Sequence, residues 1–150
     1  MSLKQQIDND IKKAMLARQK EELEALRSIK SLILLAETEK GGSGDVAVDV
    51  ENKLLMKAAK QRKESADIFA QQGRNDLADK ELAQLEIINR YLPKQLSGDE
   101  VEAELKKIIA ETGASGPQDM GKVMGTATKK LAGQADGKIV SELVKKLLTS

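Results

Sequence analysis

The sequence predicts an all-α protein built from two helical parts, and three observations support this prediction. Aromatic side chains make up only 1% of the 150 residues, so strands would lack the residues that they favour. Leucine, isoleucine and alanine recur every three or four positions, which is the spacing of amphipathic helices. Capping residues, glycines and prolines interrupt this pattern at intervals that suit helix ends.

Four helices are expected before residue 93. The first begins with Ser2 as its N-cap and has Gln5 three residues later, which is the pattern of a capping box. The second runs from about Lys20 to Lys40 and is the most apolar. It ends at Gly41-Gly42, because paired glycines do not favour continuation of a helix.

A glycine-serine stretch, Gly41 to Asp45, follows the second helix. It resembles the glycine-serine loop of amidases, but no second serine or lysine stands at a useful spacing. A flexible connector is therefore the favoured interpretation. The Gly-Lys-Ser/Thr run of a phosphate-binding loop is missing, so no nucleotide site is expected.

The third and fourth helices are expected on either side of Gly73. Asp49 is the candidate N-cap of a helix that ends near Gln72, where Gly73 supplies a left-handed stop. Asn75 is the candidate N-cap of the next helix, which Pro93 prevents from continuing. The inward stripe of that helix is expected to comprise Leu77, Leu82, Leu85, Ile88 and Leu92.

Residues 93–96 are expected to join an N-terminal helical domain, residues 1–92, to a tail domain, residues 97–150. Proline biases the residue before it toward extended geometry, which interrupts the helical pattern here. Ser97 and Glu100 then form a second capping-box pattern. A new domain is therefore predicted to begin at Ser97.

Three helices are expected in the tail domain. The first ends near Thr112, with Gly113 as its stop. Gly116-Pro117 opens the second, because proline suits the first turn of a helix. Asp136 begins the third, where its carboxylate can accept the unpaired N–H groups of the first turn.

The charge of the chain is nearly balanced as a whole but uneven along its length. Residues 1–92 hold 16 basic and 16 acidic side chains, whereas residues 117–150 hold six basic and three acidic ones. A local basic face can bind a phosphate backbone even on a nearly neutral protein. The alternative is that these basic residues form an ordinary solvated surface that binds no nucleic acid.

The composition removes several kinds of chemistry. The chain has no cysteine and no histidine, so disulfides, thiolate nucleophiles and the commonest general base and metal ligands are missing. The carboxylates form no recognisable binding loop, so neither a metal nor a cofactor is expected. No run approaches the roughly 18 apolar residues of a membrane span. We therefore expect a cytoplasmic protein with no membrane partner.

The helix after Pro117 is expected to have two unlike faces. One face is apolar, with Met120, Val123, Met124, Ala127 and Leu131. The other gathers Gly121, Lys122, Gly125, Thr126, Lys129 and Lys130. A glycine inside a helix costs about 1 kcal/mol relative to alanine, so two of them predict that something approaches this backbone. From spacing alone a crossing helix is favoured, with a ligand as the alternative.

The run Asp136-Gly137-Lys138 is interpreted first as a helix N-cap. Lys138 would then lie in the first turn of the helix, where the macrodipole slightly disfavours a cation. A lysine at such a position is weakly indicative of an anionic partner.

Several runs together resemble the YqeY family, which is related to the tail of the GatB subunit of glutamyl-tRNA(Gln)/aspartyl-tRNA(Asn) amidotransferase. In the predicted tail they are Asp119-Met-Gly-Lys-Val-Met-Gly125, Ala135-Asp-Gly-Lys-Ile-Val140 and Val144-Lys145. Upstream they are Gln61-Arg62-Lys63-Glu64-Ser65 and Tyr91-Leu92-Pro93-Lys94-Gln95-Leu96. The resemblance thus extends over nearly the whole chain.

The resemblance implies a helical N-terminal domain and a three-helix GatB/YqeY-type tail, which in the amidotransferase contacts tRNA while catalysis lies elsewhere. It carries RNA contact over to Gly121, Lys122, Gly125, Lys129, Gly137 and Lys138, and Lys130 joins them by its face. With Phe69 and Tyr91 as the only aromatic residues, base stacking is scarce. We therefore expect phosphate and shape recognition of folded RNA such as tRNA, and no DNA binding.

Three functions compete on this sequence. The first is a non-catalytic tRNA-binding accessory module that serves an amidotransferase or an aminoacyl-tRNA synthetase. The second is a component of a glutamine-dependent carbon-nitrogen ligase activity, with Glu64 and Asp67 acting beside Lys60 or Lys63. Surface ion pairs are far commoner at these spacings, so no catalytic residue is assigned. The third is a helical protein-protein adaptor that binds no RNA.

Overall fold

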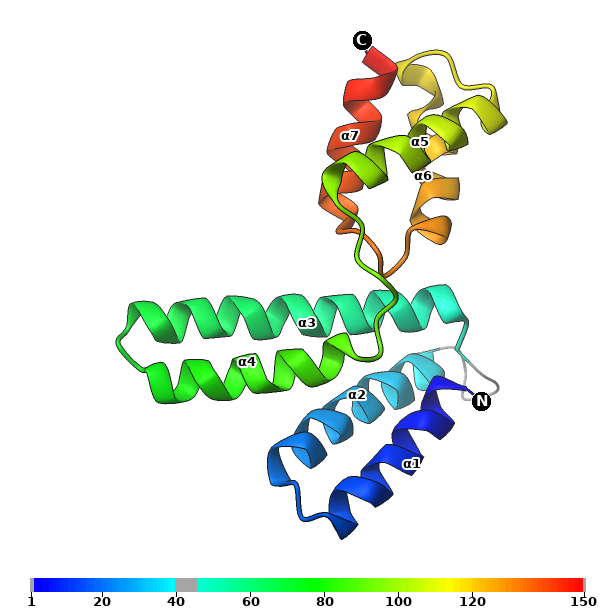
Figure 1. The fold of residues 1–150 in the computed structure, drawn as a ribbon. Helices are drawn as coiled ribbons and strands as arrows, with labels where there is room; N and C mark the ends of the chain where they lie inside the picture. The colour runs from blue at the N-terminus through cyan, green and yellow to red at the C-terminus, as the bar shows by residue number, and fades with distance from the viewer. Residues whose placement is uncertain (1, 40–45, 150) are drawn as a thin grey trace. The chain divides into compact units, whose positions relative to one another are not determined.

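The computed structural model describes residues 2–39 and 46–149, and this part of the chain consists of helices joined by short turns and loops (Figure 1). Seven α-helices and one short 3-10 turn occur in it, without a strand, so the all-α prediction is confirmed. No helix within these two ranges is long and apolar enough to cross a bilayer. The predicted stop at Gly41-Gly42 and the connector to Asp45 lie outside the described residues.

The packing of the chain divides it into two units, Met1–Leu92 and Pro93–Ser150. The N-terminal unit holds α1 (Leu3–Leu16), α2 (Lys20–Glu39), α3 (Val48–Gln71) and α4 (Asn75–Asn89). The C-terminal unit holds α5 (Gly98–Thr112), the 3-10 turn η1 (Pro117–Asp119), α6 (Met120–Lys130) and α7 (Gly137–Thr149).

The N-terminal unit consists of two helical hairpins, α1 with α2 and α3 with α4, and α2 packs on both helices of the second hairpin (Figure 1). Its core is aliphatic. The largest fully buried side chains are Ile7, Leu26, Ile29, Leu55 and Ile88. Burial of one such side chain stabilises the fold by about 1.5–3 kcal/mol.

Arg62 of α3 joins three helices at the edge of this core. Its guanidinium donates to Ser28 Oγ of α2 at 3.2 Å and pairs with Glu81 of α4 at 3.4 Å. The side chains of Arg62 and Glu81 are only 28% and 19% exposed, so water screens this pair less than a surface pair. Arg62 in the Gln61–Ser65 run therefore has a structural role.

The C-terminal unit packs α5, α6 and α7 around a second aliphatic core, which includes Val101, Leu105, Val123, Ala127 and Val144. The segment before α5 is held by the same unit. The Leu96 N–H donates to the carbonyl of Gln134 at 2.9 Å, and the Gln95 amide donates to the carbonyl of Gly133.

Most of the predicted helix ends are confirmed. Complete capping boxes occur at Ser2 with Gln5 and at Ser97 with Glu100. Gly113 ends α5 with a φ of 70°, and Gly73 follows α3 with a φ of 75°. These positive φ values explain why glycine stands at both positions.

Two predicted N-caps are wrong. Ala47 is the cap residue of α3, so Asp49 lies inside the first turn. Its negative charge there still interacts favourably with the helix dipole. Arg74 is the cap residue of α4, and Asn75 is the first residue of the helix. A capping side chain contributes only about 1 kcal/mol, which is too little to fix a helix end against tertiary packing.

The predicted inward stripe of α4 is also partly wrong. Leu82 is 48% exposed, whereas Ala78, Ile87 and Ile88 are buried, because the buried face is set by contact with α2 and α3. The helix ends at Asn89, so Leu92 packs against the core from beyond the helix.

The tail helices begin close to the predicted residues. Pro117 opens the 3-10 turn η1, and α6 starts at Met120. Asp136 precedes α7, and its Oδ1 accepts a hydrogen bond from the Lys138 N–H at 3.0 Å. The N-cap interpretation of Asp136 is therefore confirmed.

The contrast between two leucines tests the N-terminal core. Leu26→Ala, at a position with no exposure, should lower the free energy of unfolding by about 2–5 kcal/mol, because it leaves a cavity. Leu16→Ala, at a position 86% exposed, should change it by less than about 0.5 kcal/mol. Urea denaturation of both variants measures these values, and equal effects would contradict the assigned core.

Candidate nucleic-acid interface

Helix α6 has the two unlike faces that the sequence predicts. Val123 and Ala127 are fully buried and belong to the C-terminal core. Five residues of the opposite side are exposed to solvent, namely Gly121, Lys122, Gly125, Lys129 and Lys130. The apolar side packs against α5 and α7, which fixes the orientation of α6 about its own axis. The lysines on the opposite side are therefore exposed to water.

The two glycines of α6 have open space beside them. A methyl group added at Gly121 or Gly125 would meet no packed neighbour within 4 Å. The interpretation of Gly121 and Gly125 as a close crossing with another helix of this chain is therefore wrong for the described residues. Packing does not offset the helix propensity that Gly125 forfeits. Approach by a ligand, which was the alternative from the sequence, stays a prediction.

A shallow depression of about 490 Å³ lies on this side of α6. We call it the lysine-glycine face, and its lining residues are Gly121, Lys122, Gly125, Thr126, Lys129 and Lys130. One helix supplies them all because residues three, four and seven apart share a side of an α-helix. The depression therefore brings together five of the seven predicted RNA-contact residues.

The remaining two predicted residues, Gly137 and Lys138, lie in the first turn of α7. Both are exposed, and a methyl group added at Gly137 would also meet no neighbour within 4 Å. They do not belong to the lining of the depression on α6. Their contribution to one binding surface stays a prediction.

The lysines of the lysine-glycine face differ in their ion pairing. Lys130 Nζ lies 2.8 Å from Glu111 Oε2 of α5, so its charge is partly neutralised within the unit. Lys122 and Lys129 form no ion pair within residues 2–39 and 46–149. These two are therefore the cations most available to an anionic partner.

Two carboxylates near this face are held in their charged form. The hydrogen bond and charge of Lys130 lower the pKa of Glu111 below its ordinary range. The pKa of Asp119 is lowered chiefly because its carboxylate accepts the Ser115 N–H at 2.9 Å, and Lys122 adds a smaller attraction. By accepting this hydrogen bond, the Asp119 carboxylate stabilises the turn before α6.

The residues of the ligase hypothesis lie on α3. Lys60, Lys63, Glu64 and Asp67 are all exposed to solvent. Such exposure does not provide the desolvated surroundings of a general acid-base site. No group of three or more side chains that could hold a metal ion occurs in the part of the chain that the structure describes.

A comparison with known families decides the affiliation of the chain. The family described as "Yqey-like protein" matches residues 4–148. The chain belongs to the YqeY family. The resemblance inferred from the motifs is therefore confirmed over nearly the whole length of this YqeY protein.

Fungal relatives of this YqeY protein carry the name "Altered inheritance of mitochondria protein 41, mitochondrial". One from Clavispora lusitaniae is 36% identical over 108 residues, which are 71% of this chain and 62% of the relative. One from Pyrenophora tritici-repentis is 31% identical over 142 residues, 93% of this chain and 77% of the relative. The chain thus spans less than two thirds of the Clavispora protein.

A second polar site was not predicted from the sequence. Arg90 and Tyr91 line a pocket in the N-terminal unit together with residues of α1 and α2. The signal available in the sequence was the run from Tyr91 to Leu96, which contributed only to the family resemblance. Residues so distant along the chain are brought together by the tertiary fold alone.

Alanine at the glycines tests whether they are kept for packing. Gly125→Ala should raise the free energy of unfolding by about 0.5–1 kcal/mol, since it improves helix propensity and meets no neighbour. Gly113→Ala should lower it by about 1 kcal/mol or more, because its φ of 70° strains any side chain. Denaturant unfolding gives both signs, and destabilisation by Gly125→Ala would restore the packing interpretation.

The Lys130–Glu111 ion pair makes the stability of the fold depend on pH. Because the folded-state pKa of Glu111 is lowered, the pair stabilises the fold above the ordinary glutamate range, and this stabilisation is lost as pH falls through the folded pKa. Lys130→Ala should therefore move the Glu111 pKa up toward its ordinary range. Carboxyl NMR titration measures the shift, with Lys129→Ala as the control that should leave Glu111 unchanged.

Proposed function

We propose that this YqeY protein is a non-catalytic module that binds folded RNA, and tRNA in particular, through the lysine-glycine face. The observation that carries the proposal is that one exposed side of α6 combines open glycines with Lys122 and Lys129, which form no ion pair within residues 2–39 and 46–149. A helix that served only the core would favour alanine at Gly125.

The geometry of α6 suits a phosphate backbone. Lys122 and Lys129 are seven residues apart, so they lie about 10 Å from each other along the axis and would meet separate phosphates. Between them, Gly125 has no side chain to hold a sugar-phosphate strand away from the helix. Phosphates thus have cations at both ends of the face and close access at its centre.

The scarcity of aromatic residues in the chain indicates which kind of RNA it would bind. Sequence-specific reading of single-stranded RNA relies on aromatic stacking, and the chain has one phenylalanine and one tyrosine. Phe69 and Tyr91 both belong to the N-terminal unit. Lysines on a helix instead favour recognition of shape and phosphates, as in a folded tRNA.

The partner of this module is part of the same proposal. The relation of the YqeY family to the amidotransferase tail suggests that the N-terminal unit serves an amidotransferase or an aminoacyl-tRNA synthetase in the cytoplasm. In this arrangement the C-terminal unit holds the tRNA, and the partner enzyme performs the chemistry.

Salt-dependent tRNA binding tests the proposal. The triple variant Lys122→Ala, Lys129→Ala, Lys138→Ala should bind total tRNA more weakly than the wild type at every salt concentration. Each lost phosphate contact should lower the slope of log affinity against log salt by about 0.7–0.9. Fluorescence anisotropy across a salt series measures both quantities, and circular dichroism checks that helicity is unchanged.

A matched control removes the same charge from other surfaces of the C-terminal unit. Lys106→Ala, Lys107→Ala, Lys145→Ala replaces three exposed lysines of α5 and α7 and should leave the affinity close to that of the wild type. Equal losses in the two triple variants would mean nonspecific charge attraction. Absence of wild-type binding at low salt would reject the RNA proposal and favour the protein adaptor.

A further inference from the structure

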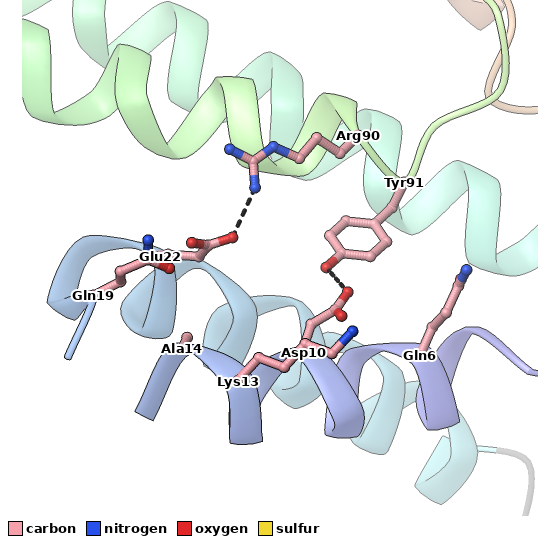
Figure 2. A pocket seen from close by; sticks show the side chains of 8 residues that line it. All are labelled: Gln6, Asp10, Lys13, Ala14, Gln19, Glu22, Arg90 and Tyr91. Carbon is pink, nitrogen blue, oxygen red and sulfur yellow. Dashed lines mark hydrogen bonds and ion pairs between the residues drawn. The ribbon is translucent and has the colours of Figure 1, made fainter. Parts of the chain in front are cut away.

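The N-terminal unit contains a pocket of about 580 Å³ that the proposed RNA function does not use (Figure 2). Three parts of the fold line this open pocket, namely one side of α1, the first turn of α2 and the residues directly after α4. Its charged lining groups are Asp10, Lys13, Glu22 and Arg90. Tyr91 adds apolar surface, whereas Ala14 is almost fully buried.

Two contacts hold the pocket in shape. Arg90 Nη1 lies 2.7 Å from Glu22 Oε1, and the Tyr91 hydroxyl donates a hydrogen bond to Asp10. Figure 2 shows both side chains extending from the end of α4 across the pocket toward α1 and α2. Burial and the contact with Asp10 raise the pKa of Tyr91, so its hydroxyl stays protonated and remains a donor.

Each charged group keeps capacity for a ligand. Asp10 and Glu22 each use one carboxylate oxygen in these contacts, and an ionised carboxylate can accept at both. The guanidinium of Arg90 has five N–H donors, of which the Glu22 contact uses one. Lys13 forms no ion pair within residues 2–39 and 46–149.

The pocket therefore offers two cations and two carboxylates at once. A purely anionic ligand would meet repulsion from Asp10 and Glu22, and a purely cationic one would meet repulsion from Lys13 and Arg90. A ligand with both charges close together satisfies both sets, because opposite charges attract most strongly at short range.

We propose that this pocket binds a free α-amino acid as a zwitterion. Its carboxylate would pair with the cations of the pocket, and its ammonium would lie near the open carboxylate oxygens of Asp10 and Glu22. The ring of Tyr91 would line the path of the side chain, and the volume leaves room for it. This inference does not depend on RNA binding by α6.

Titration with free amino acids tests the proposal on the full chain. Amide NMR spectra should be recorded with L-leucine, L-glutamine, L-glutamate and L-arginine up to about 10 mM, which covers affinities near 1 mM. At least one of them should give saturable shifts confined to the pocket residues. Ethylamine and propionate, which carry one charge each, should bind at least tenfold more weakly.

Neighbouring lysines of α1 supply a matched pair of variants. Lys13→Ala should weaken binding of that amino acid at least tenfold, because a charge-assisted hydrogen bond is lost. Lys12→Ala, at an exposed position outside the pocket lining, should leave it unchanged. Asp10→Asn removes the opposite charge with little change of shape and should weaken binding to a similar degree.

Three results would overturn the proposal. The first is the absence of saturable shifts with every amino acid of the panel. The second is binding of ethylamine or propionate as tight as that of the amino acid. The third is an equal loss in Lys12→Ala and Lys13→Ala. Because Lys13 lies in the N-terminal unit, tRNA affinity should be unaffected in Lys13→Ala, which separates this test from that of the RNA proposal.

Discussion

The structure depends on close packing of aliphatic side chains, because almost no aromatic volume is present to fill its cores. Leucine, isoleucine and valine supply the bulk, and buried alanines let the helices approach one another. In the N-terminal core these alanines are Ala14, Ala25, Ala36, Ala58 and Ala59. Cores of small side chains leave little space for a buried polar site, so both candidate sites lie on the outer faces of helices or where helix ends meet.

Local sequence signals were sufficient for most of the fold. Apolar periodicity, the capping boxes at Ser2 and Ser97, and the left-handed glycines Gly73 and Gly113 act within one turn of helix, so neighbours along the chain specify them. The errors at Asp49, Asn75 and Leu82 have a different origin. There the packing of α2, α3 and α4 sets the helix start and the buried face, and a local preference of about 1 kcal/mol does not prevail.

The two candidate sites differ in how far the sequence could predict them. The lysine-glycine face lies on one helix, so helical spacing alone collects its residues. Only the structure shows that no helix among the described residues packs on Gly121 and Gly125. The pocket in the N-terminal unit brings Asp10 together with Tyr91 and Glu22 together with Arg90, which are 81 and 68 positions apart. No spacing rule links such residues, and one sequence carries no signal for their contact.

The contact between Tyr91 and Asp10 also bears on the order in which the protein is made. A ribosome releases α1 before α4, yet Ile7 and Ala14 are buried in a core that also contains Ile87 and Ile88 near the end of α4. The α1–α2 hairpin therefore leaves the exit tunnel with apolar surface that only a later segment covers. Closure of the N-terminal unit has to wait until the chain has emerged through Tyr91, and until then the hairpin exposes apolar surface that makes it prone to aggregate.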